Sequence, residues 1–387
     1  MLLNYYNKKS KEEILKNEND ISLEKINDIE SSNKLILGEN LKVLKHLLYN
    51  LNLQNSIDLV YIDPPFATNS HFKIGTDRTS TISSSNSDET AYSDILIGSD
   101  FIEFIRERLI LLRELLSDKG SIYLHIDYKI GHYVKIVMDE VFGVSNFRND
   151  ITRIKCNPKN FKRRAYGNIK DLILFYTKTD NYIWNEPKVE LTEESIARLF
   201  KKIDSKGSKY TTIPLHAPGE TQNGNTGKAW RGMLPPKGRH WRSDPMIFDE
   251  LDKQGLIEWS SNGVPRKIVY ADAQKEKGQK LQDIWEYKDP PYPVYPTQKN
   301  ENLLDLIIKT SSNEGSLVMD CFAGSGTTIL SAQRNRRNWI GVDSSNHSID
   351  VIKESLNQLT VEEQNLYSPK INYELYSMVK QDIAITA

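Results

Sequence analysis

The segment from Ile57 to Ile62 most constrains how this chain can fold, because it is an apolar run that alternates poorly and ends in Asp63-Pro64-Pro65-Phe66. A run rich in β-branched and aromatic residues is typical of a strand buried on both faces of a parallel sheet. Asp63 would then lie at the carboxyl end of the strand, the edge where ligands bind in open α/β sheets. The two prolines fix φ and offer no N–H, so the loop presents carbonyl oxygens.

The residue types in this loop indicate a ligand. A carboxylate from Asp63, a carbonyl from Pro64 and the ring of Phe66 suit a planar heterocycle with an exocyclic amino group, which needs acceptors for its N–H bonds and a face for stacking. The same Asp-Pro-Pro sequence can equally be a turn that ends a strand. A binding function therefore requires a second site elsewhere in the chain.

Strands and helices alternate up to about residue 178 and again after Pro296. Apolar patterns predict strands at 35–37, 57–62, 121–127, 171–178, 316–320 and 339–343, and helices at 41–51, 101–116 (closed by Gly120), 129–142 and 302–310. Strands that alternate with helices predict an α/β, Rossmann-like fold with a mostly parallel sheet and right-handed crossovers.

The chain of 387 residues has room for more than one domain. We predict a charged N-terminal arm or helix at 1–30, an α/β domain formed by 31–180 and 291–360, an inserted loop-rich domain at 181–290, and a C-terminal tail at 361–387. The Gly and Pro content of 181–290 and its loss of periodicity favour an independent module.

The polar, Ser/Thr-rich segment 67–99 is long for a connection inside a compact domain. Segments of this kind commonly act as lids or binding loops. Because it follows Asp63 directly, we expect it beside the same sheet edge.

Charge is distributed unevenly along the chain. The formal net charge is −1, but residues 148–243 contain 20 Lys and Arg against 9 Asp and Glu, a local balance of +11. This balance favours a polyanion as partner over a merely solvated face. The basic and aromatic residues concerned are Arg153, Lys155, Lys159, Lys162, Arg163, Arg164, Trp230, Arg231, Arg239, Trp241 and Arg242.

Other functional classes are disfavoured by composition. The two cysteines, Cys156 and Cys321, lie far apart without metal-ligand neighbours, so we expect neither a disulfide framework nor a metal site. No apolar run approaches the ~20 residues needed to span a bilayer, and the N-terminus has no signal-peptide core. We expect a cytoplasmic enzyme without membrane contact.

A second candidate site lies near the C-terminus. The strand that ends at Asp320 is followed by a turn containing Gly324 and Gly326, a helix, and a strand that ends at Asp343, 23 positions after Asp320. This arrangement holds adenosine cofactors, because glycines let the backbone approach and the acid binds ribose hydroxyls. Thr327 and its neighbours replace the small residue that packs beneath a dinucleotide pyrophosphate. S-adenosylmethionine, whose ammonium needs an anion such as Asp320, therefore fits better than a nicotinamide dinucleotide.

Together these motifs resemble the β-class amino-methyltransferases of DNA, including the Mod-like enzymes of restriction-modification systems. Asp63-Pro64-Pro65-Phe66 resembles their catalytic motif, Phe322-x-Gly324-x-Gly326 their cofactor motif, and Pro296-Thr297-Gln298-Lys299 the motif before the cofactor strand. The order, with the catalytic motif first and a basic insert between, is that of the β class. Asn300 and Cys321 stand where the family often has proline, which affects the stiffness of the loops.

The resemblance implies an S-adenosylmethionine-dependent methyltransferase fold and a role for each matching residue. Asp63 and the carbonyl of Pro64 would accept hydrogen bonds from the target amine, and Phe66 would stack on the flipped base. Thr297 and Lys299 would lie near the methionine carboxylate of the cofactor, and Gly38-Glu39-Asn40 near its adenine. Glu39 can equally be the charge at a helix N-terminus. The full predicted cofactor set is Glu39, Asn40, Thr297, Lys299, Asp320, Phe322, Gly324, Gly326, Thr327 and Asp343.

The predicted activity is site-specific methylation of adenine N6 in double-stranded DNA, since Asp before Pro-Pro favours adenine by family habit. Cytosine N4 presents the same kind of amine, and physics alone does not separate the two. Other hypotheses are an RNA-base or amide methyltransferase, a DNA-binding subunit without catalysis, and a nicotinamide oxidoreductase. The DNA contacts are predicted in the insert and before it, at Lys162, Arg163, Arg164, Arg231, Arg239 and Arg242. A homodimer or a restriction subunit is a further possible partner.

Overall fold

The structure is a computed structural model that describes residues 2–17, 20–65, 71–74, 79–80, 89–93, 98–158, 164–189, 191–291, 299–362 and 371–380. The chain divides into two compact units. The larger unit comprises Met1–Glu186 and Gln282–Ala387, and the smaller unit comprises Pro187–Leu281. No helix within these described ranges is long and apolar enough to cross a membrane.

The larger unit is built on one sheet, which in the described ranges has 10 strands in the order β1-β21-β2-β20-β19-β3-β7-β9-β8-β18. The strands are β1 (Ile21–Lys25), β2 (Lys34–Leu37), β3 (Ile57–Ile62), β7 (Leu116–Ile126), β8 (Phe147–Ile154), β9 (Lys170–Thr177), β18 (Ile284–Trp285), β19 (Leu317–Asp320), β20 (Asn338–Asp343) and β21 (Glu374–Lys380). Every pair of neighbours from β21 to β7 is parallel. The predicted mostly parallel α/β sheet is confirmed.

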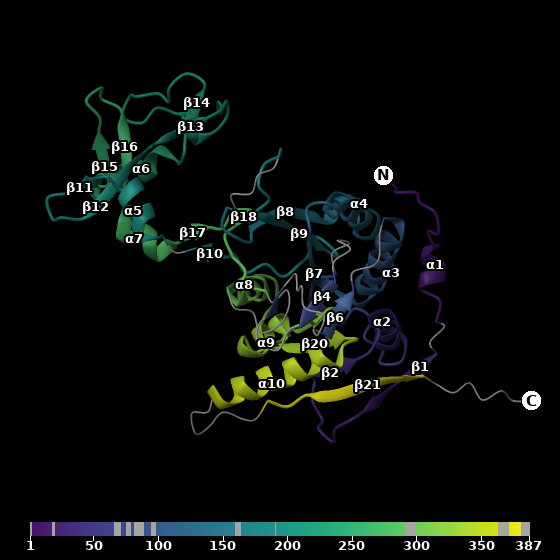
Figure 1. Cartoon of the computed structure of the whole chain (residues 1–387). Coiled ribbons are helices and arrows are strands. Elements are labelled where there is room, and N and C mark those ends of the chain that lie inside the picture. The colour runs from purple at the N-terminus through teal and green to yellow at the C-terminus, as the bar shows by residue number, and fades with distance from the viewer. Residues whose placement is uncertain are drawn as a thin grey trace, which may run out of the picture. The chain divides into compact units, whose positions relative to one another are not determined.

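Two sets of helices cover the two faces of the sheet (Figure 1). They are α1 (Lys11–Ile14), α2 (Asn40–Tyr49), α3 (Ser99–Leu115), α4 (Gly131–Phe142), the 3-10 turn η1 (Val144–Asn146), α8 (Glu301–Ser311), α9 (Thr327–Arg334) and α10 (Asn346–Glu362). The connections β2→β3→β7 advance in one direction along the sheet, and β19→β20→β21 in the other. Because crossovers are right-handed, α2 and α3 lie on one face and α9 and α10 on the other. The direction changes between β3 and β19, which is where open α/β sheets bind ligands.

The position of β3 in the core explains its apolar sequence. Ile57, Leu59, Val60 and Ile62 are completely buried, since helices cover both of its faces. Burial of apolar surface stabilises the fold by about 25 cal/mol for each Å² removed from water. Asp63 follows the last residue of this buried strand, so the packing of β3 in the core also fixes the position of the Asp63 carboxylate.

Three features differ from the predictions. Helix α3 ends at Leu115, and not near Gly120, because Leu116 is already extended (φ −61°, ψ 137°) and begins β7. β9 runs antiparallel to β7, since the strand β8 precedes it and pairs with it in an antiparallel ladder. Both predicted terminal segments, 1–30 and 361–387, supply strands to the sheet, β1 and β21.

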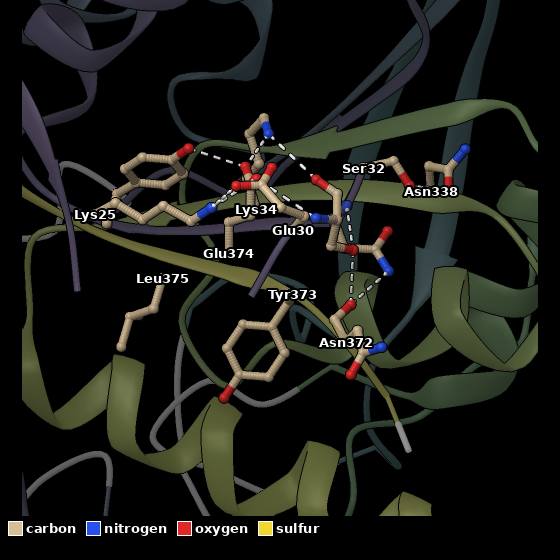
Figure 2. Close-up of polar contacts among 12 residues, drawn as sticks. Lys25, Glu30, Ser32, Lys34, Asn338, Asn372, Tyr373, Glu374 and Leu375 are labelled. Carbon is tan, nitrogen blue, oxygen red and sulfur yellow. Dashed lines mark hydrogen bonds and ion pairs between the residues drawn. The ribbon is translucent and has the colours of Figure 1, made fainter. Parts of the chain in front are cut away.

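A cluster of polar contacts fastens β21 between β1 and β2 (Figure 2). Glu374 is 5% exposed and accepts hydrogen bonds from the ammonium groups of Lys25 and Lys34 and from the hydroxyl of Tyr376. Burial would raise the pKa of Glu374, but these three donors outweigh it and lower the pKa to about 2. The C-terminal strand is therefore anchored by a carboxylate that the chain itself satisfies.

The smaller unit has short strands and several small cores. Its elements are β10 (Lys188–Val189), α5 (Glu193–Leu199), β11 (Lys202–Ile203), β12 (Lys209–Pro214), β13 (His216–Pro218), η2 (Asn225–Gly227), β14 (Arg239–Trp241), α6 (Pro245–Lys253), β15 (Ile257–Trp259), β16 (Pro265–Tyr270), α7 (Ala271–Lys277) and β17 (Gln279–Lys280). β11, β12, β16 and β15 form an antiparallel sheet, and β13 pairs with β14. One core gathers Leu215, Trp230, Trp241 and Phe248.

Within 67–99, the segment predicted as a lid or binding loop, the structure describes three strands, β4 (His71–Ile74), β5 (Thr79–Ser80) and β6 (Glu89–Ser93), and the start of α3. The three strands form a small antiparallel sheet. The rest of the predicted loop lies outside the described residues.

Candidate active site

A pocket of about 520 Å³ opens at the carboxyl ends of β3 and β19, a size suited to a small-molecule cofactor. These strands are direct neighbours, with Leu59 opposite Val318 and Val60 opposite Met319. Asp63 leaves β3 and Asp320 ends β19, so two residues far apart in sequence meet at one edge. Of the predicted site residues, the pocket is lined by Glu39, Asn40, Asp63, Pro65, Lys299, Asp320, Phe322, Gly324, Thr327 and Asp343.

The remaining predicted residues are distributed differently. Pro64 is buried and Gly326 is the N-cap residue of helix α9, and neither lines the pocket. Phe66 and Thr297 lie outside the described residues. Among the described residues, Asp63 and Pro65 of the proposed catalytic motif share one cavity with Phe322 and Gly324 of the proposed cofactor motif.

Asp320 is a buried acid that faces the pocket with few donors. It is 3% exposed and accepts hydrogen bonds from the Phe322 N–H (2.9 Å) and the Thr328 hydroxyl (2.6 Å). Burial raises the pKa of Asp320 to about 7, the two hydrogen bonds oppose this shift, and the charges of Asp63 and Asp343 add to it. A cation in the pocket would offset both the cost of burying the Asp320 charge and its repulsion by the neighbouring acids. These residues therefore fit a positively charged ligand.

The glycine-rich turn holds Asp343 in place. Asp343 accepts hydrogen bonds from the N–H of Gly324 (2.8 Å) and of Ser345 (2.9 Å), and burial raises its pKa. Gly326 has φ +77°, and a Cβ there would approach Ile352 to 2.6 Å, so the turn requires glycine. A carboxylate held by backbone amides at this edge can accept hydrogen bonds from ribose hydroxyls.

Glu39 and Asn40 line the pocket but are also committed within the protein. Glu39 caps α2 by accepting from the N–H of Leu41 and Lys42, so the helix-terminus interpretation of Glu39 is confirmed. The guanidinium of Arg108 donates to Glu39 and to Asn40, both at 2.6 Å. These contacts fix the wall of the pocket formed by the start of α2.

Sequence reasoning missed Arg108 and Phe104, which line the pocket from α3. Arg108 is only 4% exposed, and its guanidinium carbon lies 3.5 Å from the centroid of the Phe104 ring. Phe104 also contacts Phe322 of the cofactor motif, with ring centroids 6.0 Å apart. An arginine within an amphipathic helix gives no sign that it is buried, so no sequence signal distinguished it.

Asp63 has two unequal carboxylate oxygens. Oδ2 is 2.5 Å from the ammonium of Lys299, whereas Oδ1 is buried and accepts no hydrogen bond from any described residue. The sequence predicts Lys299 near a cofactor carboxylate, and the structure pairs it with Asp63 in the same pocket, where both side chains are largely excluded from water. A buried acceptor without a donor is costly, so an N–H or O–H brought to Oδ1 would stabilise it.

The predicted DNA contacts fall into distinct groups. Arg231 is ion-paired with Asp249 (2.8 Å) and Asp252 (2.7 Å). Arg239 and Arg242 are exposed and have no carboxylate partner among the described residues. Burial lowers the pKa of His216, and the charges of Arg239 and Arg242 lower it further. Arg164 is exposed, while Lys162 and Arg163 lie outside the described residues.

Three residues expected on a polyanion-binding surface are buried. Arg153 is completely buried and donates to Asp289 at 2.5 Å. Trp230 and Trp241 are 2% and 1% exposed and form part of the core of the smaller unit. The prediction of an exposed polyanion-binding surface is wrong for these three residues. Core packing buries the two tryptophans, and an internal ion pair neutralises Arg153.

The fold and pocket define an α/β enzyme with a site for an adenosine-bearing, cationic cofactor. The chain matches the DNA methylase family model over residues 57–354 and belongs to that family. It is 41% identical to the type II methyltransferase M.EcaI of Enterobacter cloacae over 81% of this chain and 67% of that protein. It is 29% identical to the StyLTI Mod subunit, from a type III restriction-modification enzyme of Salmonella typhimurium, over 77% of this chain.

The chain spans 49% of the length of the StyLTI Mod subunit. Among solved structures, the protein TTHA0409 from Thermus thermophilus aligns with 89% of this chain and 99% of that chain, at 15% identity and a TM-score of 0.45.

Proposed function

We propose that this protein is a site-specific DNA methyltransferase that transfers a methyl group from S-adenosylmethionine to the N6 amino group of a flipped adenine. The observation that carries the proposal is that Asp63, whose buried Oδ1 accepts no hydrogen bond from any described residue, lines one pocket with Asp320 and Gly324. An acceptor for an amine and a site for a cationic methyl donor then lie in one cavity.

The cofactor fits the acids of the pocket. Asp320, whose pKa is raised by burial, is suited to pair with the cofactor ammonium, and Asp343 to bind its ribose hydroxyls. Phe322 and Phe104 offer apolar faces beside them. When bound, S-adenosylmethionine supplies an electrophilic methyl group.

Asp63 would act on the amine of the target base. The lone pair of an exocyclic amine is conjugated into the ring, so accepting its N–H in a hydrogen bond favours a pyramidal, more nucleophilic nitrogen. Lys299 occupies Oδ2 and leaves Oδ1 for this purpose. The base must leave the duplex to reach the pocket, at a cost of about a few kcal/mol.

Recognition of DNA is assigned to the smaller unit. Arg239 and Arg242 are exposed and have no carboxylate partner among the residues that the structure describes, so their charges are available to phosphates. The relatives named as a type II methyltransferase and as type III Mod subunits support a role in restriction-modification, with a nuclease subunit as a candidate partner.

The test measures transfer of tritium from methyl-labelled S-adenosylmethionine to DNA, followed by mass spectrometry of the hydrolysed nucleosides. We expect N6-methyladenine, at one sequence context when DNA from an expressing host is sequenced with modified-base detection. N4-methylcytosine would overturn the choice of adenine. Absence of label from every DNA tested, with the cofactor bound, would overturn the methyltransferase function.

A further inference from the structure

Behind Asp63, a series of buried polar side chains crosses three adjacent strands. Tyr61 of β3, His125 of β7 and Asp171 of β9 are each at most 2% exposed. The Tyr61 hydroxyl lies 2.9 Å from Nδ1 of His125, and Nε2 of His125 lies 3.3 Å from Oδ2 of Asp171. Nδ1 is also 3.9 Å from Oδ1 of Asp63, the oxygen without a hydrogen-bond donor.

The environment of Asp171 determines where the imidazole proton lies. Burial would raise the pKa of Asp171, but the contacts with His125 and Lys155 lower it further, so Asp171 is an ionised acceptor. Lys155 donates to its Oδ1 at 2.6 Å, and the guanidinium of Arg153 lies 3.6 Å from its Oδ2. Only a proton on Nε2 of His125 allows the ring to donate to Asp171.

The opposite nitrogen is then an acceptor. Burial lowers the pKa of His125, so the ring is neutral and a proton on Nε2 leaves Nδ1 with a lone pair. The Tyr61 hydroxyl can donate to that lone pair. With this tautomer Nδ1 presents a lone pair, and not an N–H, on the side of Oδ1 of Asp63, which lies 3.9 Å away and beyond hydrogen-bond distance.

Resting on the proposed function, we infer that Asp171 and His125 are positioning residues that keep Oδ1 of Asp63 available to the amino group of the target base. Asp171 holds the imidazole proton on Nε2, and Tyr61 occupies Nδ1. The other tautomer would place an N–H 2.9 Å from the Tyr61 oxygen and 3.9 Å from Oδ1 of Asp63, so it would compete with the substrate for Oδ1 whenever the Asp63 carboxylate turned toward it. The network therefore protects an acceptor.

The Asp171→Asn variant tests the role of the His125 tautomer. Asp171→Asn replaces an acceptor with an amide whose oxygen is retained by Lys155 and whose N–H faces Nε2, so the proton moves to Nδ1, on the side of Asp63. We expect the single-turnover methyl-transfer rate to fall about tenfold or more, with cofactor affinity unchanged. His125→Leu removes the misplaced donor, so the His125→Leu/Asp171→Asn double variant should be faster than Asp171→Asn alone. Independent structural damage would instead accumulate in the double variant.

The matched control is Asp139→Asn. Asp139 accepts from Tyr176 and Lys135 and is not among the residues that line the pocket, so this acid-to-amide change should leave the transfer rate unaltered. Melting temperature and titration with S-adenosylmethionine check the fold of each variant. A wild-type rate in Asp171→Asn, or a double variant slower than Asp171→Asn, would overturn the inference.

A spectroscopic measurement keeps the inference testable even if a variant fails to fold. Nitrogen-15 NMR of the full chain labelled at its 7 histidines reports which ring nitrogen of His125 carries the proton, with His125→Leu used to assign its signals. We expect Nε2–H in the wild type, and a proton on Nδ1 would refute the inference. Wild-type protein that shows Nε2–H but transfers no methyl group would refute the proposed function separately.

Discussion

Two buried acids of the same sheet differ in how the chain treats their charge. Glu374, at the edge formed by β1, β21 and β2, receives hydrogen bonds from two lysines and a tyrosine, and its pKa falls to about 2 (Figure 2). Asp320, at the pocket, receives one hydroxyl and one N–H and lies near two further acids, and burial raises its pKa to about 7. The first acid is satisfied by the fold, whereas the second is left for a ligand.

The same contrast separates the arginines of the smaller unit. Arg231 is neutralised by Asp249 and Asp252, while Arg239 and Arg242 have no carboxylate partner among the described residues. Charge counted along a sequence therefore does not identify a binding surface. We expect the charges that the fold leaves uncompensated to identify it better, and this expectation can be tested at four places.

The largest effect is expected at Asp63. Asp63→Asn places an amide where Oδ1 accepts and removes the charge that pairs with Lys299. Methyl transfer should fall about 10²- to 10³-fold, the range for loss of one group that stabilises the transition state. Tritium transfer measures the rate, and calorimetry measures cofactor affinity, which should stay nearly constant. An equal loss of cofactor binding would assign Asp63 to the cofactor site instead.

The sequence predicts position best where an acid directly follows or ends an apolar run. Asp63, Asp320 and Asp343 were placed at strand ends, and they line one pocket because parallel strands expose their carboxyl ends at one edge. Their strands are apolar runs or precede a glycine turn, so periodicity and composition were enough to find them.

Features that depend on sheet neighbours could not be predicted. His125 and Asp171 become meaningful only when β9 pairs with β7, and Glu374 only when β21 pairs with strands more than 300 residues earlier in the chain. Arg153 has the same ambiguity, since one sequence pattern serves an exposed basic surface and a buried ion pair. Pairing and burial are tertiary properties that a local pattern does not encode.

A smaller effect is expected for DNA affinity. Arg239→Ala/Arg242→Ala should weaken binding to any duplex about tenfold or more at low salt, and should reduce the slope of log affinity against log salt by about 2, near one for each lost phosphate contact. Fluorescence anisotropy across a salt series measures both quantities. Arg231→Ala is the matched control, and we expect it to leave the slope unchanged because Asp249 and Asp252 already neutralise it. Equal slopes in all variants would contradict the distinction between compensated and uncompensated arginines.

The pH dependence of cofactor binding tests the charge of Asp320. Its pKa of about 7 in the ligand-free pocket means that a cationic cofactor must displace a proton below that pH. Affinity for S-adenosylmethionine should be constant above about pH 7.5 and fall by up to about tenfold per pH unit below about pH 6.5. Calorimetric titration at several pH values measures this. Asp320→Asn should bind more weakly and without this dependence, and the same affinity of the wild type at about pH 6 and about pH 8 would refute the assignment.

The smallest effect is expected at Glu374, where the chain satisfies the acid and no ligand is involved. Its pKa is lowered from 4.5 to about 2, so ionised Glu374 stabilises the fold above about pH 4.5, and this contribution is lost as the pH falls toward 2. Glu374→Gln should lower the free energy of unfolding by about 1 to 2 kcal/mol near neutral pH, after allowance for solvent screening, and the difference should vanish in acid. Thermal unfolding at a series of pH values measures it. Glu30→Gln removes an exposed partner of Lys25 and should cost less than about 0.5 kcal/mol, while methyl transfer should be unchanged in both variants. A loss of stability in Glu374→Gln that persists at about pH 2 would mean that shape, and not charge, anchors the C-terminal strand.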